Sequence, residues 1–248
     1  MKPGEFSNRG NGITVCQKLE QIKAIVKQKK KHDNGNWKTY IVQEYIDRPM
    51  LYCRRKFDIR HYMLITYING HKKGYWYQDG YIRTTSYEYS TKNCFGSVHL
   101  TNDAIQKNLP DYGKYEKGNK LSYDEFERYL QREYKGKYSF FESIYPKMKK
   151  LSQDSMRASS LILDEQSKGH NFEIFGFDFM IDADFHPWLI EINTNPCLEI
   201  SCPALMEIIP PMIENAIKIG VDSVFLPPSS FTEKRARFSS NCLDENKF

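Results

Sequence analysis

The chain has 248 residues, enough to bury a substantial core as one large domain or as two lobes that share a cleft. Lysine and arginine number 36 against 31 aspartate and glutamate, a net charge of +5. That balance permits attraction to an acidic partner but does not by itself indicate nucleic acid, because no basic stripe with interleaved aromatic residues is present. The sequence has no secretory signal and no apolar stretch of membrane length. We therefore expect a cytosolic, nuclear or cytoskeletal protein that binds neither nucleic acid nor membrane.

The strands are predicted from short apolar runs bounded by turn residues. In chain order they are expected at residues 40–46, 56–68, 175–181 and 188–193. A hairpin is expected to turn at Asp79-Gly80, a dipeptide suited to a two-residue type I′ turn. Residues 86–120 are polar, rich in tyrosine and expected to be irregular.

The helices are predicted from apolar residues at helical spacing. They are expected from Val15 onward, at 122–133, at 146–166 and at 204–220. Ser122 and Glu125 form a capping-box signature at the start of the second helix, and Pro210-Pro211 should kink or split the last one. Helices mixed with hairpin-linked strands predict an α+β architecture with mainly antiparallel sheets.

The six cysteines are scattered, at positions 16, 53, 94, 197, 202 and 242, and no CxxC pair occurs. This spacing argues against a zinc site and favours free thiols in a reducing compartment.

The strongest chemical signal is a pair of acids inside two apolar strands. If the hairpin around residues 183–186 is symmetric, Asp178 lies directly opposite Glu191, with Cβ atoms roughly 5 Å apart. Two carboxylates at that distance repel by about 3 kcal/mol at an effective dielectric near 20, so a cation between them or a protonated acid is expected. Asn193 projects from the same face as Glu191 and adds a neutral oxygen. Oxygen ligands in small number suit Mg²⁺ shared with nucleotide phosphates. The alternative is an exposed acidic face on a surface hairpin.

A second signal is the charged face of the strand at 56–68. Lys56, Asp58 and Arg60 alternate with Phe57 and Ile59, so the charged side chains share one face and the apolar ones the other. Arg83, from the neighbouring predicted strand, is expected to join this face, as the wall of a phosphate site would require. Taken alone, the pattern is more typical of a solvent-facing edge strand with ordinary ion pairs.

The third signal is the loop at residues 7–12, which contains Arg9, Gly10 and Gly12. Closely spaced glycines allow backbone N–H groups to converge on a phosphate. The loop is not a Walker A sequence, because no Gly-Lys-Ser/Thr follows, and taken alone it is by default a flexible surface turn.

At these residues the chain resembles the tubulin–tyrosine ligase family, which has the ATP-grasp fold. The resemblance rests on motifs that occur in family order: Lys2-Pro3-Gly4 with residues 7–13, Val42-Gln43-Glu44-Tyr45-Ile46, residues 55–60, Tyr81-Ile82-Arg83, residues 99–107, residues 175–180 and residues 188–196. It extends over most of residues 2–227 and begins at the lysine, so the N-terminal part of the family is expected to be missing. We therefore expect a partial ATP-grasp domain at 1–228, with two lobes of mainly antiparallel sheet clamping ATP in a cleft, and a flexible polar tail at 229–248.

The resemblance implies a role for each site residue. Lys2 and Lys56 would contact the ATP phosphates next to the loop with Arg9, Gly10 and Gly12, and Gln43, Glu44, Tyr45 and Ile46 would form the adenine hinge. Asp178, Glu191 and Asn193 would hold Mg²⁺. The residues implied near the γ-phosphate and the incoming amino acid are Asp58, Arg60, Arg83, Thr101 and Asn102.

The reaction implied is the ATP-dependent addition of an amino acid, tyrosine or glutamate, to a carboxylate of a tubulin tail through an acyl phosphate. Residues 111–119 resemble the tyrosine ligase, whereas Thr194-Asn195-Pro196 resembles the branch that includes polyglutamylases. The resemblance implies a cytoplasmic protein associated with microtubules, with cilia as one setting. Two alternatives remain open: a truncated module that binds ATP or microtubules without catalysis, and a small-molecule ATP-grasp ligase.

Overall fold

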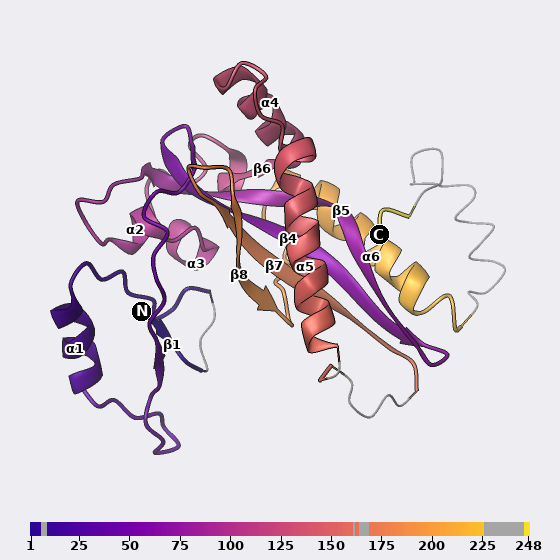
Figure 1. Cartoon of the computed structure of the whole chain (residues 1–248), viewed down its shortest axis with the longest axis horizontal. Helices are drawn as coiled ribbons and strands as arrows, with labels where there is room; N and C mark the ends of the chain where they lie inside the picture. Colours follow the sequence, from indigo (N-terminus) through magenta and orange to yellow (C-terminus); the bar gives the residue numbers. More distant parts are fainter. Residues whose placement is uncertain (6–8, 161, 164–168, 226–245) are drawn as a thin grey trace. The chain divides into compact units, whose positions relative to one another are not determined.

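The computed structural model describes residues 1–5, 9–160, 162–163, 169–225 and 246–248 (Figure 1). The strands are β1 (Lys2–Pro3), β2 (Tyr40–Ile41), β3 (Leu51–Tyr52), β4 (Arg55–Ile68), β5 (His71–Glu88), β6 (Lys120–Ser122), β7 (Asn171–Ile181) and β8 (Pro187–Asn193). The helices are α1 (Leu19–Lys27), α2 (Gly96–His99), α3 (Asp103–Gln106), α4 (Tyr123–Glu133), α5 (Tyr145–Ser159) and α6 (Pro203–Gly220). A 3₁₀ turn at Lys117–Asn119 and a π turn at Phe140–Ile144 complete these elements.

The main sheet is ordered β6-β5-β4-β7-β8, with β3 paired to β4, and β1 pairs with β2 in a separate small sheet. Strand β4 pairs antiparallel with both β3 and β7, and β1 pairs antiparallel with β2. The predicted mixture of helices with mainly antiparallel strands is therefore confirmed.

The chain divides into two compact units. The first unit comprises Met1–Asp58, Arg83–Asn119 and Ile181–Phe185; the second comprises Ile59–Ile82, Lys120–Met180 and His186–Phe248. Strands β4 and β5 each contribute residues to both units. The arrangement of two lobes around ATP remains a prediction.

The predicted hairpin turn at Asp79-Gly80 is wrong. Strand β5 continues through both residues, and β4 connects to β5 at Asn69 and Gly70, whose φ angles of 51° and 79° are those that a type I′ turn requires. A Cβ on Gly80 would lie 2.5 Å from the Arg60 carbonyl oxygen and closer still to the Tyr123 hydroxyl. Gly80 is therefore explained by close packing inside a strand.

Other element boundaries differ from the sequence prediction for local reasons. The strand predicted at 40–46 is limited to Tyr40–Ile41, and the first helix begins at Leu19, four residues after Val15. The last helix is continuous through Pro210 and Pro211, so the prediction of a split is wrong; packing of its apolar face offsets the lost hydrogen bonds.

The predicted capping box at the start of α4 is confirmed. The Glu125 backbone N–H donates to Ser122 Oγ at 3.2 Å, and the Ser122 N–H donates to Glu125 Oε2 at 2.7 Å. These two bonds satisfy donors that a helix start leaves without intrahelical partners.

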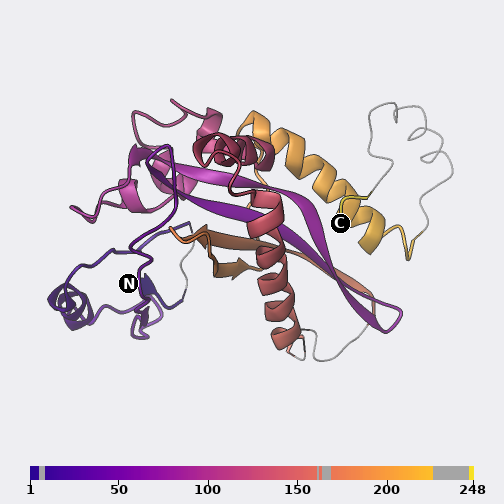
Figure 2. The ribbon, with the colours of Figure 1, turned by 45° about the horizontal axis from the view of Figure 1, so that its top comes forward.

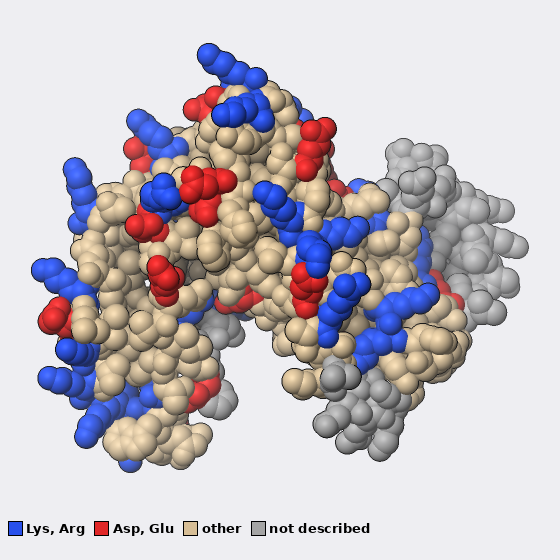
Figure 3. Space-filling model, in the orientation of Figure 1, with Lys and Arg blue, Asp and Glu red and all other residues tan. Residues whose placement is uncertain are grey.

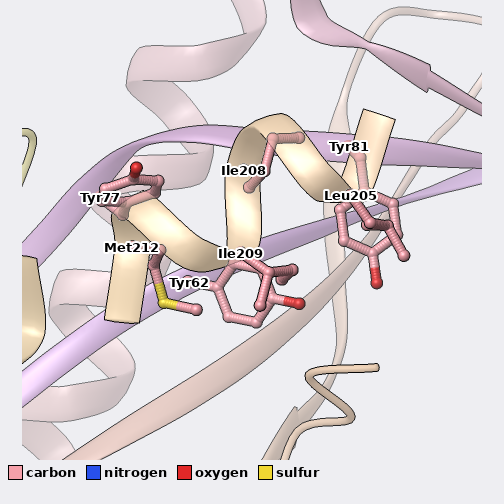
Figure 4. Packing of buried hydrophobic residues seen from close by; sticks show 7 residues of the cluster. All are labelled: Tyr62, Tyr77, Tyr81, Leu205, Ile208, Ile209 and Met212. Atoms are coloured by element: carbon pink, nitrogen blue, oxygen red, sulfur yellow. The ribbon is translucent and has the colours of Figure 1, made fainter. Parts of the chain in front are cut away.

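Helices α5 and α6 cover opposite faces of the sheet in the second unit (Figure 2). His61 of β4 contacts the ring of Tyr145, the first residue of α5. Its neighbour Tyr62 packs in a cluster with α6 (Figure 4), and successive strand residues point to opposite faces. The buried members of this cluster are Tyr62, Tyr77, Tyr81, Leu205, Ile208, Ile209 and Met212.

Most of the predicted flexible tail lies outside the described residues, but its last three residues are placed. Phe248 packs on Tyr77 with ring centroids 4.8 Å apart, and Lys247 Nζ lies 2.6 Å from Asp79 Oδ2. The aromatic side chain of Phe248 thus packs against an apolar cluster, and the flexible tail at 229–248 stays a prediction. Ser7, Asn8 and the predicted helix residues 164–166 also lie outside the described part.

Candidate functional site

In the first unit, the charged face of β4 is buried and paired. Asp58 accepts hydrogen bonds from Nε and Nη2 of Arg83, the former at 2.9 Å, and both side chains are buried. Arg83 thus reaches the charged face of β4 from β5, although the hairpin that was expected to place it there turns elsewhere. The reading of β4 as a solvent-facing edge strand is wrong, because β5 and β7 flank it.

Lys56 is buried beside an aromatic hydroxyl. Its Nζ donates to Tyr45 Oη at 3.0 Å and lies 4.6 Å from the Tyr45 ring centroid. The same hydroxyl lies 2.8 Å from Nδ1 of His99. Burial lowers the pKa of the Lys56 ammonium to about 8, and the neighbouring Asp58 carboxylate offsets part of that effect. The structure thus brings together a predicted phosphate ligand, a predicted hinge residue and His99, which sequence reasoning assigned no role.

The glycine-rich loop approaches Asn102. Gly10 and Gly12 both have left-handed backbone conformations, with φ of 79° and 75°. A Cβ on Gly10 would lie 2.7 Å from Asn102 Oδ1, so no larger residue fits there without movement. Thr101 is buried, Arg9 is exposed, and two predicted site residues, Gly10 and Asn102, are neighbours.

Two anchors of this region were missed from the sequence. Gln106 accepts from the Ser86 backbone N–H at 2.8 Å and donates to the Leu100 carbonyl at 2.6 Å, which ties α3 to β5. Arg55 forms a bidentate pair with Glu116 at 2.8 and 2.5 Å. Glu116 is far from Arg55 in the sequence, and Gln106 is far from Ser86, so no local sequence pattern predicts these contacts.

Lys2 is held in β1, where it pairs with Ile41 of β2. The Met1 ammonium and the Thr14 carbonyl are 2.9 Å apart, and the Thr14 N–H donates to the Met1 carbonyl at the same distance. The predicted hinge residues that follow β2 differ in exposure: Gln43 and Glu44 are exposed. Tyr45 and Ile46 are half-buried.

In the second unit, Asp178 is paired with an arginine. Arg60 Nε and Nη2 donate to its two carboxylate oxygens at 2.5 and 3.2 Å, and both side chains are buried. The sequence argument called for a cation between the two acids or a protonated acid; for Asp178 the guanidinium of Arg60 already compensates the carboxylate. The paired positions Arg60 and Asp178 face each other across β4 and β7.

Glu191 and Asn193 lie on β8, which ends the order of the sheet. Glu191 is exposed, which differs from the apolar surroundings predicted for it. Asn193 donates from Nδ2 to the Gly176 carbonyl at 3.3 Å. The opposition of Asp178 and Glu191 across β7 and β8 stays a prediction.

The donor chemistry of these three side chains fits Mg²⁺. Their oxygen atoms are the hard ligands that this ion prefers. An ionised carboxylate accepts at about four lone-pair positions, so the Arg60 bonds are compatible with a metal ligand. No cluster of three or more His, Cys, Asp or Glu suited to a metal exists among the described residues. The five described cysteines are free thiols.

The surface charges are mixed in sign over most of the face drawn in Figure 3. Lysine side chains gather around the end of α1 and the segment after it, where Lys27, Lys29, Lys30 and Lys31 are all exposed. In the described part of the chain, no helix has the length and apolar character needed to cross a bilayer.

The antiparallel strands with buried basic and acidic side chains agree with the ATP-grasp fold that the ordered motifs imply. A family model described as the tubulin-tyrosine ligase family matches residues 1–231. The chain belongs to the tubulin-tyrosine ligase family.

Curated relatives cover most of this chain. Tubulin glycylase 3A of Drosophila melanogaster is 38% identical over 220 residues, which are 86% of this chain and 21% of that protein. Human protein monoglycylase TTLL8 is 32% identical over 226 residues, 90% of this chain and 26% of that protein. Human tubulin monoglycylase TTLL3 is 32% identical over 227 residues, 90% of this chain and 28% of that protein. The chain thus spans between about a fifth and three tenths of the length of these relatives.

Proposed function

We propose that this chain carries nucleotide-binding and catalytic residues of an ATP-dependent ligase that joins glycine, through an amide bond, to a carboxylate of a tubulin tail. The observation that carries the proposal is the buried ionic face of β4 in a chain whose relatives bear the name glycylase. The sequence prediction named tyrosine or glutamate as the amino acid. Relatives from flies and humans named for glycylation favour glycine instead.

In this proposal the first unit binds the nucleotide. Lys2 and Lys56 contact the phosphates, the loop with Arg9, Gly10 and Gly12 directs backbone N–H groups to them, and residues 43–46 hold the adenine. A partly depressed lysine pKa near 8 still leaves the Lys56 ammonium mostly charged at neutral pH. A compact buried cation of this kind can neutralise phosphate charge as it develops.

Asp178, Glu191 and Asn193 are the residues that would hold Mg²⁺. The ion, when bound, would neutralise charge on the ATP phosphates. The pairing of Asp178 with Arg60 holds the carboxylate in a fixed orientation on β7.

The reaction proposed has two steps. The acceptor carboxylate attacks the γ-phosphorus of ATP and releases ADP, which gives an acyl phosphate. The glycine amine then attacks the acyl carbon, phosphate leaves, and a proton is lost from the nitrogen as the amide forms. Arg60 and Arg83 would stabilise the negative charge of these steps, with Asp58, Thr101 and Asn102 orienting the reactants.

The decisive experiment measures incorporation of labelled glycine, tyrosine and glutamate into tubulin with Mg·ATP. We expect glycine to be incorporated in preference to the other two. The substitution Lys56→Met should reduce the rate about a hundredfold without unfolding the chain, because a buried ammonium is replaced by an apolar side chain of similar length.

The matched control is Lys114→Met, at a lysine that is 54% exposed and paired with Asp111. It should leave incorporation unchanged. Folded protein that incorporates none of the three amino acids would contradict the proposal, and sedimentation with microtubules in that case would favour the non-catalytic binding module. If tubulin is modified, the enzyme is expected at microtubules, including those of cilia.

A further inference from the structure

Lys56 stands at one end of a chain of hydrogen bonds within the first unit. Lys56 Nζ lies 3.0 Å from Tyr45 Oη, and that oxygen lies 2.8 Å from His99 Nδ1. At the other side of the ring, His99 Nε2 lies 2.7 Å from the Asn93 carbonyl oxygen. Three consecutive short contacts thus join the ammonium to the backbone of a loop.

The chemistry of the two ends fixes the protons in between. A carbonyl oxygen only accepts, so His99 Nε2 carries a proton and donates to Asn93. An ammonium only donates, so the Tyr45 oxygen accepts from Lys56. In a neutral imidazole, Nδ1 is then the acceptor for the Tyr45 proton. Each of the hydrogen-bonding atoms between Lys56 Nζ and the Asn93 carbonyl then has a partner.

A protonated His99 would disrupt this order. Its Nδ1–H would point at Tyr45 Oη, so the tyrosine proton would have to leave His99 and turn to the Tyr89 hydroxyl, with which Tyr45 also interacts. A second positive charge would also face the Lys56 ammonium. Both effects oppose the geometry that holds Lys56.

The surroundings favour the neutral ring. His99 is 3% exposed, and the rings of Tyr45 and Tyr89 meet it edge-on with centroids 5.6 Å away. Burial lowers the pKa of His99, the positive charge of Lys56 lowers it further, and the bond to the Asn93 carbonyl opposes them. The other titratable groups that act on these hydrogen-bonded residues are Asp58 on Lys56, Tyr89 and Cys94 on Tyr45, and Asp47 on Tyr89.

We propose that Tyr45 and His99 are positioning residues that hold the Lys56 ammonium for the ATP phosphates, and that protonation of His99 releases it. The inference rests on the proposed function, because it takes Lys56 as a phosphate ligand. It adds a regulatory property: acid should weaken nucleotide binding through a side chain that does not itself touch the nucleotide.

The test is the dissociation constant of Mg·ATP, measured by calorimetry with the full chain from pH 7.5 to pH 5.0. For the wild type we expect the constant to rise at least about threefold over this range. Tyr45→Phe removes the hydroxyl and should raise it about three- to tenfold at pH 7.5. In glycine incorporation the same variant should raise KM for ATP and leave kcat nearly unchanged, because it weakens binding alone.

His99→Gln provides the specific readout. Its amide can accept from Tyr45 and donate to Asn93 but does not titrate, so binding should be close to wild type at pH 7.5 and lose the pH dependence of the wild type. The matched control is Tyr123→Phe, which removes a hydroxyl that also lies 2.8 Å from Nδ1 of a buried histidine, His61. Tyr123→Phe should lower the melting temperature and leave the dissociation constant and its pH dependence at wild-type values.

The outcomes separate the two claims. Wild-type protein that is folded and does not bind Mg·ATP overturns the proposed function and this inference with it. Wild-type binding with an identical pH dependence in His99→Gln overturns the inference alone, as does a Tyr45→Phe variant that binds as tightly as wild type. If Tyr45→Phe does not fold, the pH dependence of Mg·ATP binding by His99→Gln still tests the inference.

Discussion

Strand β4 and the segment before residue 49 are opposites in burial, although both carry predicted site residues. From Arg55 to Leu64 every residue of β4 is buried, and four of them are charged: Arg55, Lys56, Asp58 and Arg60. No described residue before position 49 is buried. Large apolar side chains stand exposed there instead, including Trp37 at 56% and Val42 at 60%.

This difference in burial predicts different effects of substitutions in the two regions. On β4 the charges of Arg55, Asp58 and Arg60 are compensated by ion pairs within the protein, so removal of one partner should affect folding as well as chemistry. In the N-terminal segment a substitution loses little packing, so an effect on ATP binding there would report on the ligand.

Arg60→Met should destabilise the protein by about 3–5 kcal/mol, because it leaves the Asp178 carboxylate buried without its guanidinium. Urea unfolding followed by circular dichroism measures this change. The double variant Arg60→Met with Asp178→Leu should recover much of the lost stability, since no uncompensated charge remains.

The control is Arg54→Met, one residue before β4. Arg54 pairs with Glu88 at 2.5 Å, but the two side chains are 80% and 58% exposed. A loss of about 1 kcal/mol or less is expected. Equal losses of unfolding free energy for Arg54→Met and Arg60→Met would show that burial does not determine how much these ion pairs contribute to stability.

The buried ammonium of Lys56 should make stability depend on pH. Its pKa is lowered from 10.5 to about 8 in the folded chain, so between these values the unfolded state binds more protons and stability rises with pH. Relative to Lys56→Met, the wild type should gain up to roughly 3 kcal/mol between pH 7.5 and pH 10. Denaturant unfolding of both proteins across this range measures the difference.

The same titration should act oppositely on the ligand. Above pH 8 the lysine loses its charge, so binding of Mg·ATP should weaken while the fold becomes more stable. A wild type and a Lys56→Met variant with parallel stability curves from pH 7.5 to pH 10 would rule out a depressed pKa at this position.

The sequence predicted the elements whose apolar pattern is long and unambiguous. Strands β4, β7 and β8 and helix α4 were placed within a few residues, and the antiparallel class followed from them. The turn at Asn69-Gly70 was missed because Asp79-Gly80 has an equally good local signature. Only packing against Arg60 and Tyr123 shows that Gly80 belongs inside a strand.

The site could be predicted in its residue types but not in its pairings. Acids and arginines on alternate strand positions indicated a charged face. Which guanidinium pairs with which carboxylate depends on the order and register of the strands. Only the structure shows that Arg60 of β4 lies opposite Asp178 of β7. The contact of Tyr45 with His99 joins residues 54 apart in sequence, through loops without periodic signal.

Gly80→Ala should destabilise the protein by about 1–3 kcal/mol, because the added methyl meets backbone of β4 and a fully enclosed tyrosine hydroxyl. Thermal unfolding measures the loss. The companion variant Tyr123→Phe with Gly80→Ala should recover part of it, since the phenylalanine vacates the position of the hydroxyl. If the double variant is no more stable than Gly80→Ala alone, the added methyl clashes with the Arg60 carbonyl and not with the tyrosine hydroxyl.

Gly10→Ala should reverse this pattern, with a small effect on stability and a larger one on the ligand. The loop is partly exposed, so the methyl group can be relieved by local movement away from Asn102, and we expect a loss of about 1 kcal/mol. Because the loop is proposed to receive phosphate, the dissociation constant of Mg·ATP should rise about tenfold, equivalent to about 1.4 kcal/mol of binding energy.

Gly35→Ala is its matched control in the same segment. Gly35 has a φ of 84°, close to that of Gly10, and an added Cβ would meet no atom within 4 Å. The backbone strain is therefore alike in the two variants, and only Gly10→Ala displaces the loop beside Asn102. Melting temperatures should fall equally, while calorimetric Mg·ATP binding should weaken for Gly10→Ala alone. If Gly35→Ala weakens binding as much, the effect comes from the strained segment as a whole, and the N-terminal loop loses its proposed role at the phosphates.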